Sequence, residues 1–299
     1  MMKKLFLFFI DGIGICSEDN PVSGLFEGIT GKRLVAGDYP YFFKSGVICT
    51  ADATLDVSGI PQSATGQTSI FTGVNASEYL GYHLTALPNQ KLVELIEQKS
   101  LMKILKEKGI TVTSANLYSK EFFEKRGERK RNAFPVSTLT IKAASVPFRY
   151  IEDYKNGRAV FADITNRGIR ERGYDIEIIT PEKGGENLLN ILDESRFVFF
   201  EYFMTDVYGH KRDRAGLEES IDIINRFTGT VFEGIEGEDT SILIISDHGN
   251  AENLSTGYHT ENNVPAVLFT ESMEDAESFA DSVHTLTDIY PWVMKYFSP

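Results

Sequence analysis

Residues 241–252 read SILIISDHGNAE, an apolar run followed by two polar side chains and a string of mostly small residues. An apolar run that does not alternate with polar residues is typical of a buried strand in a sheet covered on both faces. Asp247 and His248 stand where this strand would end. In open α/β sheets, functional groups gather where strands finish and loops begin. The stretch therefore predicts an α/β protein with a polar site at its strand ends.

Four further apolar runs predict strands of the same kind: residues 5–10, 110–114, 197–203 and 266–269. Helical patterns lie between them. Residues 91–108 show helical spacing with a break near Ser100, and residues 180–182 (Thr-Pro-Glu) begin another helix with threonine as N-cap. Residues 215–235 and 288–297 predict two more helices. This alternation indicates an α/β fold with a mostly parallel sheet.

Residues 120–177 differ from the rest of the chain. They contain a basic run at 125–131, several further arginines and only short apolar pieces. We expect this stretch to form a small cap or lid, inserted into a core made of residues 1–119 and 178–299. The basic run is predicted to be a solvated face, with an anion-facing lid as the alternative.

The overall charge restricts the class of partner. Among 299 residues, 43 are acidic and 30 are basic, which gives a formal net charge of −13. A broad nucleic-acid footprint needs positive surface, so we expect no nucleic-acid partner. An anionic substrate would have to be attracted locally, by metal ions or a few arginines.

The N-terminal sequence and the cysteines indicate the compartment. The apolar run at residues 5–10 is too short for a signal peptide and ends in an acid, so a first core strand fits better. No window approaches the roughly 18–20 apolar residues of a membrane span. Cys16 and Cys49 form no disulfide framework and predict two buried thiols in a reducing environment. We expect a cytoplasmic protein without a membrane partner.

A set of polar residues follows the predicted strands or lies in the loops after them: Asp11, Ser63, Asp206, His210, Asp247, His248 and His259. Asp206 and His210 are four residues apart, so on a helix both side chains can reach one ion. Carboxylates and imidazoles that converge suit a divalent transition metal or zinc. The absence of sulfur ligands permits Mn²⁺ or Zn²⁺ without selecting between them.

Ser63 is the predicted nucleophile. It precedes an apolar helical stretch, and helix N-termini favour anions. A coordinated metal would activate its hydroxyl, which is otherwise a poor nucleophile at neutral pH. Thr65 and Thr68 are the competing hydroxyls, although they more readily line the helix.

These motifs together resemble the alkaline phosphatase superfamily, most of all the branch of cofactor-independent phosphoglycerate mutase and phosphopentomutase. The motifs are FFIDGIG at 8–14, SATGQ at 63–67, TDVYGHKRD at 205–213, DHGNAE at 247–252 and HT at 259–260. The resemblance implies an alkaline phosphatase-like three-layer core. It also implies two ion sites, one formed by Asp11, Ser63, Asp247 and His248, and one by Asp206, His210 and His259.

The departures from the branch concern the substrate. Gln67 replaces the usual histidine, the chain is much shorter than the phosphoglycerate mutase, and that enzyme's substrate-binding arginines have no matched positions here. The sulfatase branch is disfavoured because no Pro-x-Arg follows Ser63. Candidate substrate-binding residues are Lys211, Arg212 and Arg214, which follow a ligand, and His83, for which a satisfied loop histidine is the alternative.

The sequence thus predicts a metal-dependent enzyme that transfers phosphoryl groups from a small phosphorylated substrate through a phosphoserine. A small cap favours hydrolysis of phosphomonoesters, because retention of an intermediate product would need exclusion of water. The alternatives are a phosphomutase, a phosphodiesterase and a non-catalytic metal-binding module. The oligomeric state is not predicted.

Overall fold

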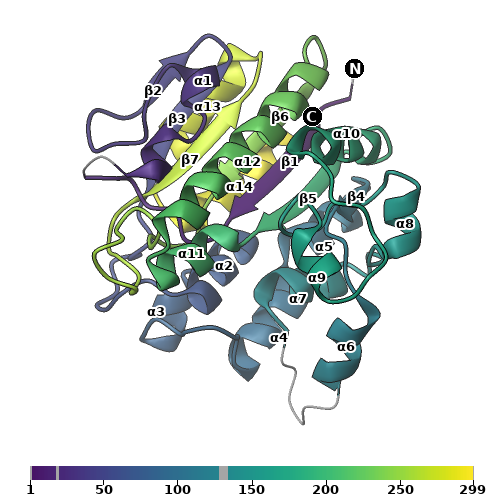
Figure 1. Ribbon diagram of the computed structural model, residues 1–299. Helices are drawn as coiled ribbons and strands as arrows, with labels where there is room; N and C mark the ends of the chain where they lie inside the picture. Colours follow the sequence, from purple (N-terminus) through teal and green to yellow (C-terminus); the bar gives the residue numbers. More distant parts are fainter. Residues whose placement is uncertain (1, 18–19, 128–133, 299) are drawn as a thin grey trace.

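The computed structural model describes residues 2–17, 20–127 and 134–298 and shows an α/β architecture around one seven-stranded sheet (Figure 1). The strand order is β2-β3-β7-β6-β1-β5-β4. The strands are β1 (Lys4–Ile10), β2 (Tyr41–Phe43), β3 (Gly46–Ala51), β4 (Val112–Ser114), β5 (Phe197–Tyr202), β6 (Thr240–Ile245) and β7 (Val264–Phe269). All five predicted strands are present.

The sheet has two halves that differ in how neighbouring strands pair. β6, β1, β5 and β4 run parallel to one another, whereas β7 is antiparallel to both of its neighbours, β6 and β3, and β2 is antiparallel to β3. The prediction of a mostly parallel sheet describes the first half. β2 and β3 were not predicted; they form a hairpin joined to the far side of β7.

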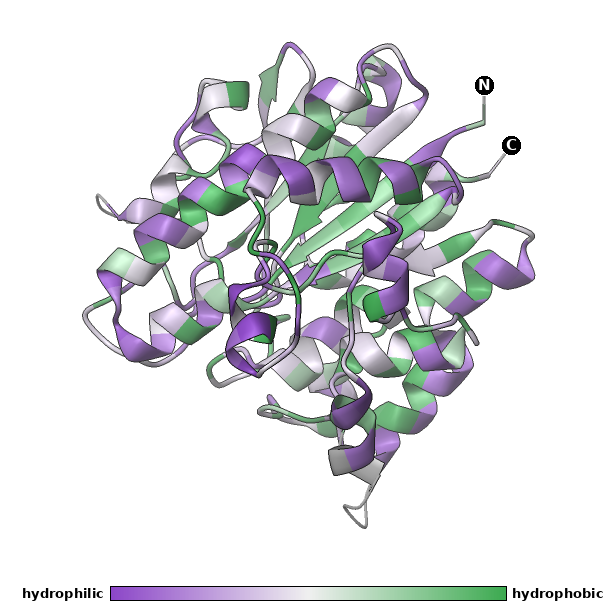
Figure 2. Cartoon of the chain, turned by 45° about the vertical axis from the view of Figure 1, so that its right-hand side comes forward, coloured by the Kyte–Doolittle hydropathy of each residue, from purple (hydrophilic) through white to green (hydrophobic). Residues whose placement is uncertain are grey.

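The sheet is buried on both faces, which explains the unbroken apolar runs. Leu5, Leu7 and Phe9 of β1 belong to one apolar core, and Phe6 and Phe8 belong to the other. Figure 2 shows hydrophobic strands in the interior and helices with polar residues facing outward. Two cores on opposite faces of one sheet make the predicted three-layer arrangement.

Helices cover each face. Over one face lie α2 (Ser63–Thr72), α4 (Gln90–Lys99), α5 (Leu101–Glu107), α7 (Val136–Ala143), α13 (Met273–Ser282) and α14 (Ile289–Tyr296). Over the other lie α10 (Pro181–Leu192) and α12 (Arg214–Gly234), with α11 (Met204–Lys211) packed against α12. As predicted, Ser100 separates α4 from α5. Thr180 caps α10, because its Oγ1 accepts a hydrogen bond from the Lys183 amide at 3.3 Å.

The stretch predicted as a cap, residues 120–177, is not a single inserted unit. α7 packs against α4 and α5, and its Leu139 and Ile141 lie in the main core. α6 (Lys120–Gly127), α8 (Ile151–Lys155) and α9 (Arg167–Glu171) lie on the β4 side of the molecule (Figure 1). A separate small apolar cluster that includes Phe161 and Ile169 supports this outer part. The side chains of residues 125–131 fall outside the described part of the chain.

Two expectations about the compartment can be compared with the structure. Cys16 and Cys49 are both buried and are not joined in a disulfide. In the described part of the chain, none of the helices combines the length and apolar character needed to traverse a bilayer.

Candidate metal centre

The parallel half of the sheet brings the predicted ligands together. Asp11 follows β1, Asp206 and His210 lie on α11 directly after β5, and Asp247 and His248 follow β6. β1 pairs with both β5 and β6 in parallel, so the three strands end side by side. The shared direction of these strands places side chains far apart in sequence at one site.

Four residues form what we call the inner cluster: Asp11, Ser63, Asp247 and His248. The Nε2 atom of His248 lies 3.4 Å from Asp11 Oδ1, 3.5 Å from Asp247 Oδ2 and 3.0 Å from Ser63 Oγ. A hydroxyl and two carboxylates thus lie within 3.5 Å of one imidazole nitrogen, so three ligand types converge on one point.

Three residues form the outer cluster: Asp206, His210 and His259. The His259 Nε2 atom lies 3.2 Å from His210 Nε2 and 3.7 Å from Asp206 Oδ1, and His210 Nε2 lies 3.3 Å from Asp206 Oδ2. The rings of His248 and His259 stack with centroids 3.6 Å apart, which joins the two clusters. We divide the residues as the family resemblance implies, and His248 lies within reach of both clusters.

The donors of the inner cluster fit a divalent cation. Asp11 Oδ1 and Asp247 Oδ1 are buried and accept no hydrogen bond. Burial, with a contribution from Asp206, raises the pKa of Asp247 to about 8. Burial and the neighbouring Asp247 raise the pKa of Asp11 well above its usual value, while burial and His259 lower that of His248 well below its own. Neutral imidazole and carboxylates that lack a counter-charge are what a bound cation would satisfy.

The outer imidazoles are oriented by backbone carbonyls. His210 Nδ1 lies 2.7 Å from the Gly257 carbonyl oxygen, and His259 Nδ1 lies 3.0 Å from that of Pro61. A carbonyl oxygen only accepts, so in both rings Nδ1 carries the hydrogen. The lone pair of each Nε2 is therefore directed into the cluster, as a metal ligand requires.

Glu252 links the loops that carry the ligands, and its role was not predicted from the sequence. Its Oε2 accepts from the amides of Gly14 and Asn250, at 3.0 Å and 2.7 Å. Its Oε1 accepts from the hydroxyl of Thr260 and from Asn262 Nδ2 at 3.0 Å. One carboxylate thus joins the loop after β1, the loop after β6 and the loop that carries His259.

Two glycines permit close approach at the site. A Cβ on Gly66 would lie 2.6 Å from the carbonyl oxygen of Asp247, so α2 can pack against the inner cluster only without a side chain there. Gly12 has a φ of +73°, and a Cβ on it would lie 2.7 Å from Asp206 Oδ1. The glycines in the FFIDGIG and SATGQ motifs therefore have steric reasons.

Ser63 is the first residue of α2, as predicted, and its hydroxyl faces the cluster. The competing hydroxyls face elsewhere: Thr65 donates to the Gln62 carbonyl at 3.1 Å and Thr68 to the Ala64 carbonyl at 2.6 Å. Of these three hydroxyls, only that of Ser63 has a hydrogen bond to a predicted metal ligand.

Gln67, the residue that departs from the branch, is buried beside the inner cluster. Its Nε2 donates to Asp247 Oδ2 at 3.2 Å. The amide therefore orients one carboxylate of the cluster.

The predicted substrate-binding residues do not face the cleft in the way that the predicted metal ligands do. His83 is held by Ser77 Oγ and by the Val57 carbonyl oxygen, each at 3.0 Å, and it does not line the cleft described below. Arg214 pairs with Glu218 at 2.9 Å on the exposed side of α12. Lys211 is exposed, and Arg212 lines a shallow hollow beside His210.

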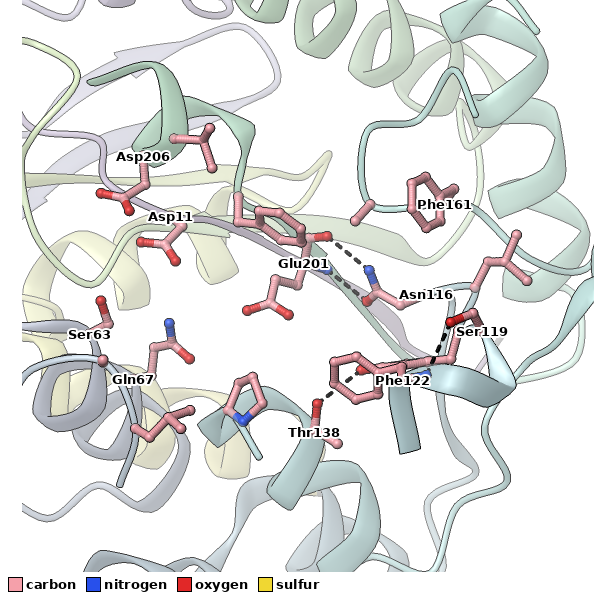
Figure 3. A pocket seen from close by; sticks show the side chains of 18 of the residues that line it. Asp11, Ser63, Gln67, Asn116, Ser119, Phe122, Thr138, Phe161, Glu201 and Asp206 are labelled. Atoms are coloured by element: carbon pink, nitrogen blue, oxygen red, sulfur yellow. Dashed lines mark hydrogen bonds between the residues drawn. The ribbon is translucent and has the colours of Figure 1, made fainter. Parts of the chain in front are cut away.

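A cleft of about 480 Å³ opens from the metal centre (Figure 3). Asp11, Ser63 and Asp206 lie at one end, and the aromatic rings of Phe122 and Phe161 lie at the other. Glu201 of β5, which was not predicted, points its carboxyl group into the space between them. Burial raises the pKa of Glu201 to about 7. An acid inside an otherwise apolar strand, FVFFEY, was the signal in the sequence.

Comparison with solved structures identifies the fold. A Pyrococcus horikoshii protein superposes with a TM-score of 0.61 at 13% identity, covering 99% of this chain and 97% of that one. The alkaline phosphatase of the Antarctic bacterium TAB5 superposes with a TM-score of 0.58 at 13% identity, covering 99% and 98%. The fold is therefore that of alkaline phosphatases, as the motifs implied.

Sequence comparison finds similarity to metalloenzymes. The family model of the metalloenzyme superfamily matches residues 176–298. A phosphopentomutase of Photorhabdus laumondii is 24% identical over 81% of this chain and 60% of its own length. A 2,3-bisphosphoglycerate-independent phosphoglycerate mutase of Methanopyrus kandleri is 28% identical over 48% of this chain and 37% of its own. The chain is thus similar to these metalloenzymes, and it spans less than two thirds of either curated relative.

Proposed function

We propose that this protein is a two-metal phosphoryl-transfer enzyme that hydrolyses phosphomonoesters with Ser63 as nucleophile. One observation carries the proposal. The Ser63 hydroxyl lies at the N-terminus of a ten-residue helix, 3.0 Å from a predicted metal ligand, and it lines the cleft. A structural metal site has no use for a hydroxyl in that position.

The residues divide the chemistry between them. Divalent ions held by the inner and outer clusters, Mn²⁺ or Zn²⁺, would supply Lewis acidity and charge neutralisation. Ser63 Oγ gives up its proton to solvent and forms the new bond to phosphorus, while the bond from phosphorus to the ester oxygen breaks and the alcohol leaves with a proton taken from water. The first amides of α2 point toward the attached phosphoryl group, because they lack partners within the helix. Water then displaces serine and releases inorganic phosphate.

Solvent access favours hydrolysis over transfer within one substrate. The His210 side chain is 47% exposed and that of Asp206 is 17% exposed, so water reaches the outer cluster. A mutase must protect its phosphoenzyme from water between two transfers. The part of residues 120–177 outside the main core is small, and the cleft opens at the metal centre.

A phosphomutase is the second candidate, because the curated relatives named above are mutases. A phosphodiesterase is less favoured, and a non-catalytic metal-binding module leaves Ser63 without a role. The reaction products separate these possibilities.

The test measures phosphate release from an aryl phosphate, a pentose phosphate and an aryl phosphodiester, with Mn²⁺ or Zn²⁺ added. We expect free phosphate from the monoesters. Ser63→Ala should lower turnover roughly 10³-fold or more while both ions stay bound. Thr65→Ala, which removes a hydroxyl from the same helix turn, is the matched control and should keep most of the activity. Isomerised product without phosphate would favour the mutase, and no turnover with either metal would favour the binding module.

A further inference from the structure

The cleft beyond the metal centre has a mixed character. One wall is formed by aromatic residues that include Tyr118, Phe122 and Phe161. The carboxyl group of Glu201 projects into the space between this wall and the Ser63 end (Figure 3). A substrate whose phosphoryl group sits at Ser63 therefore places its organic group against Glu201 and the aromatic wall.

Glu201 is held in place by three hydrogen bonds. The Asn116 side chain accepts from the Glu201 amide and donates to the Glu201 carbonyl, both at 2.9 Å. This continues the pairing of β5 past Ser114, where β4 ends. Ser137 of α7 donates to Glu201 Oε2 at 2.8 Å.

One oxygen of this carboxyl group remains available. Within the described part of the chain, Glu201 Oε1 has no hydrogen-bond partner. It is not one of the fully buried polar atoms without a partner, so a ligand in the cleft can reach it. An acceptor fixed beside an aromatic wall selects for a donor on the ligand, because a polar group that the ligand buries without a partner costs free energy.

The charge around Glu201 points to an uncharged ligand group. Asp11 and Asp206 line the same cleft as Glu201, so carboxyl groups gather on its Ser63 side. Arg172 is the one cation among the described residues that line the cleft, and it lies 5.6 Å from the centre of the Phe161 ring, on the aromatic side. A substrate carboxylate beside Glu201 would meet like charge, whereas a hydroxyl would donate to Oε1.

We propose that Glu201 is a specificity-determining residue that accepts a hydrogen bond from a hydroxyl of the substrate's organic group. The enzyme then takes phosphate monoesters of uncharged hydroxylated compounds in preference to phosphorylated carboxylic acids. This inference rests on the phosphoryl-transfer function proposed above and adds the substrate class.

The test uses ester substrates that differ in one group. Glycerol phosphate and 3-phosphoglycerate differ by a hydroxymethyl against a carboxylate, and phenyl phosphate lacks any hydroxyl. We expect wild-type kcat/KM to be at least about tenfold higher for glycerol phosphate than for 3-phosphoglycerate. Ribose 5-phosphate, a larger hydroxylated ester, should behave like glycerol phosphate.

Two variants change different properties of Glu201. Glu201→Leu removes the acceptor, and the ratio of kcat/KM for glycerol phosphate over phenyl phosphate should fall about tenfold. Glu201→Gln removes the charge and should lower the ratio of kcat/KM for glycerol phosphate over 3-phosphoglycerate. Glu97→Gln, an exposed carboxyl on α4, is the control, and thermal melting verifies that each variant folds.

The outcomes are distinguishable. Unchanged ratios in both variants would overturn the inference and leave the phosphatase proposal intact. An equal loss on all esters that added Mn²⁺ or Zn²⁺ restores would place Glu201 in the metal centre and would also overturn the inference. Absence of turnover by the wild type on every ester would overturn both proposals.

Discussion

The inner and outer clusters use the same ligand chemistry in different surroundings. The side chains of Asp247 and His248 are 0% exposed, whereas those of Asp206 and His210 are 17% and 47% exposed. Burial removes the solvent that would otherwise stabilise a carboxylate, so the inner cluster depends on a cation for its charge balance. In the outer cluster, solvent water can still stabilise the charge of Asp206. The difference suggests that the inner ion is held firmly and that the outer one exchanges with solvent.

The largest expected effect comes from removing one ligand on each side. Asp247→Asn should abolish ion binding at the inner cluster and turnover with it. The loss should exceed the roughly 10–100-fold cost of removing a residue that only hydrogen-bonds to a metal ligand. His210→Ala should weaken mainly the second, looser site, and excess metal should restore part of the activity. Metal titration followed by calorimetry would measure both affinities. Equal losses at the two sites would remove the distinction between the clusters.

The pH dependence of stability should sharpen the same distinction. Asp247 has a folded pKa of about 8 against an ordinary value of 3.8, so above 3.8 the unfolded chain has lost a proton that the folded, metal-free chain retains. Stability then falls as the pH rises toward 8. The lowered pKa of His248 acts oppositely, but only below its ordinary value of 6.5.

Between pH 6.5 and 8, His248 therefore does not offset the loss of stability that the raised carboxyl pKa causes. We expect the metal-free protein to lose on the order of 1–3 kcal/mol over this window and the metal-loaded protein to lose little. Urea unfolding with and without a chelator at each pH would measure it. A metal-free stability that rises over this window would show that the inner cluster is not a charge-deficient site.

Glu252 supports both clusters, and its substitution should affect them together. Glu252→Gln replaces one acceptor oxygen by a donor, which opposes either the two amides or the two side-chain donors. We expect roughly 10–100-fold weaker metal binding at both sites. Glu261→Gln, an exposed carboxyl on the loop of His259, is the matched control. An effect confined to one cluster would show that the loops are positioned independently.

The smallest expected effect is that of His83→Ala. Both ring nitrogens of His83 are occupied by hydrogen bonds away from the cleft. The substitution should change kcat/KM less than about twofold and cost about 1 kcal/mol of stability. A clear rise in KM with an unchanged free energy of unfolding would show instead that His83 contacts the substrate.

The difference between the two halves of the sheet shows where prediction from the sequence succeeded. The four strands of the parallel half, and β7 beside them, gave apolar runs because helices cover both faces. The β2–β3 hairpin was not predicted, since β2 has only three residues and half-exposed positions. Residues 136–143 also belong to the core, and nothing local separates them from the surrounding insertion.

The sequence by itself determined the ligand types, their order and the helix on which Ser63 begins, because motifs at strand ends depend on local chain geometry. Only the tertiary structure decided that Glu201 enters the cleft and that Glu252 joins three loops. It alone also shows which cluster is buried. These properties depend on neighbours brought close by parallel strand pairing, which no short stretch of sequence records.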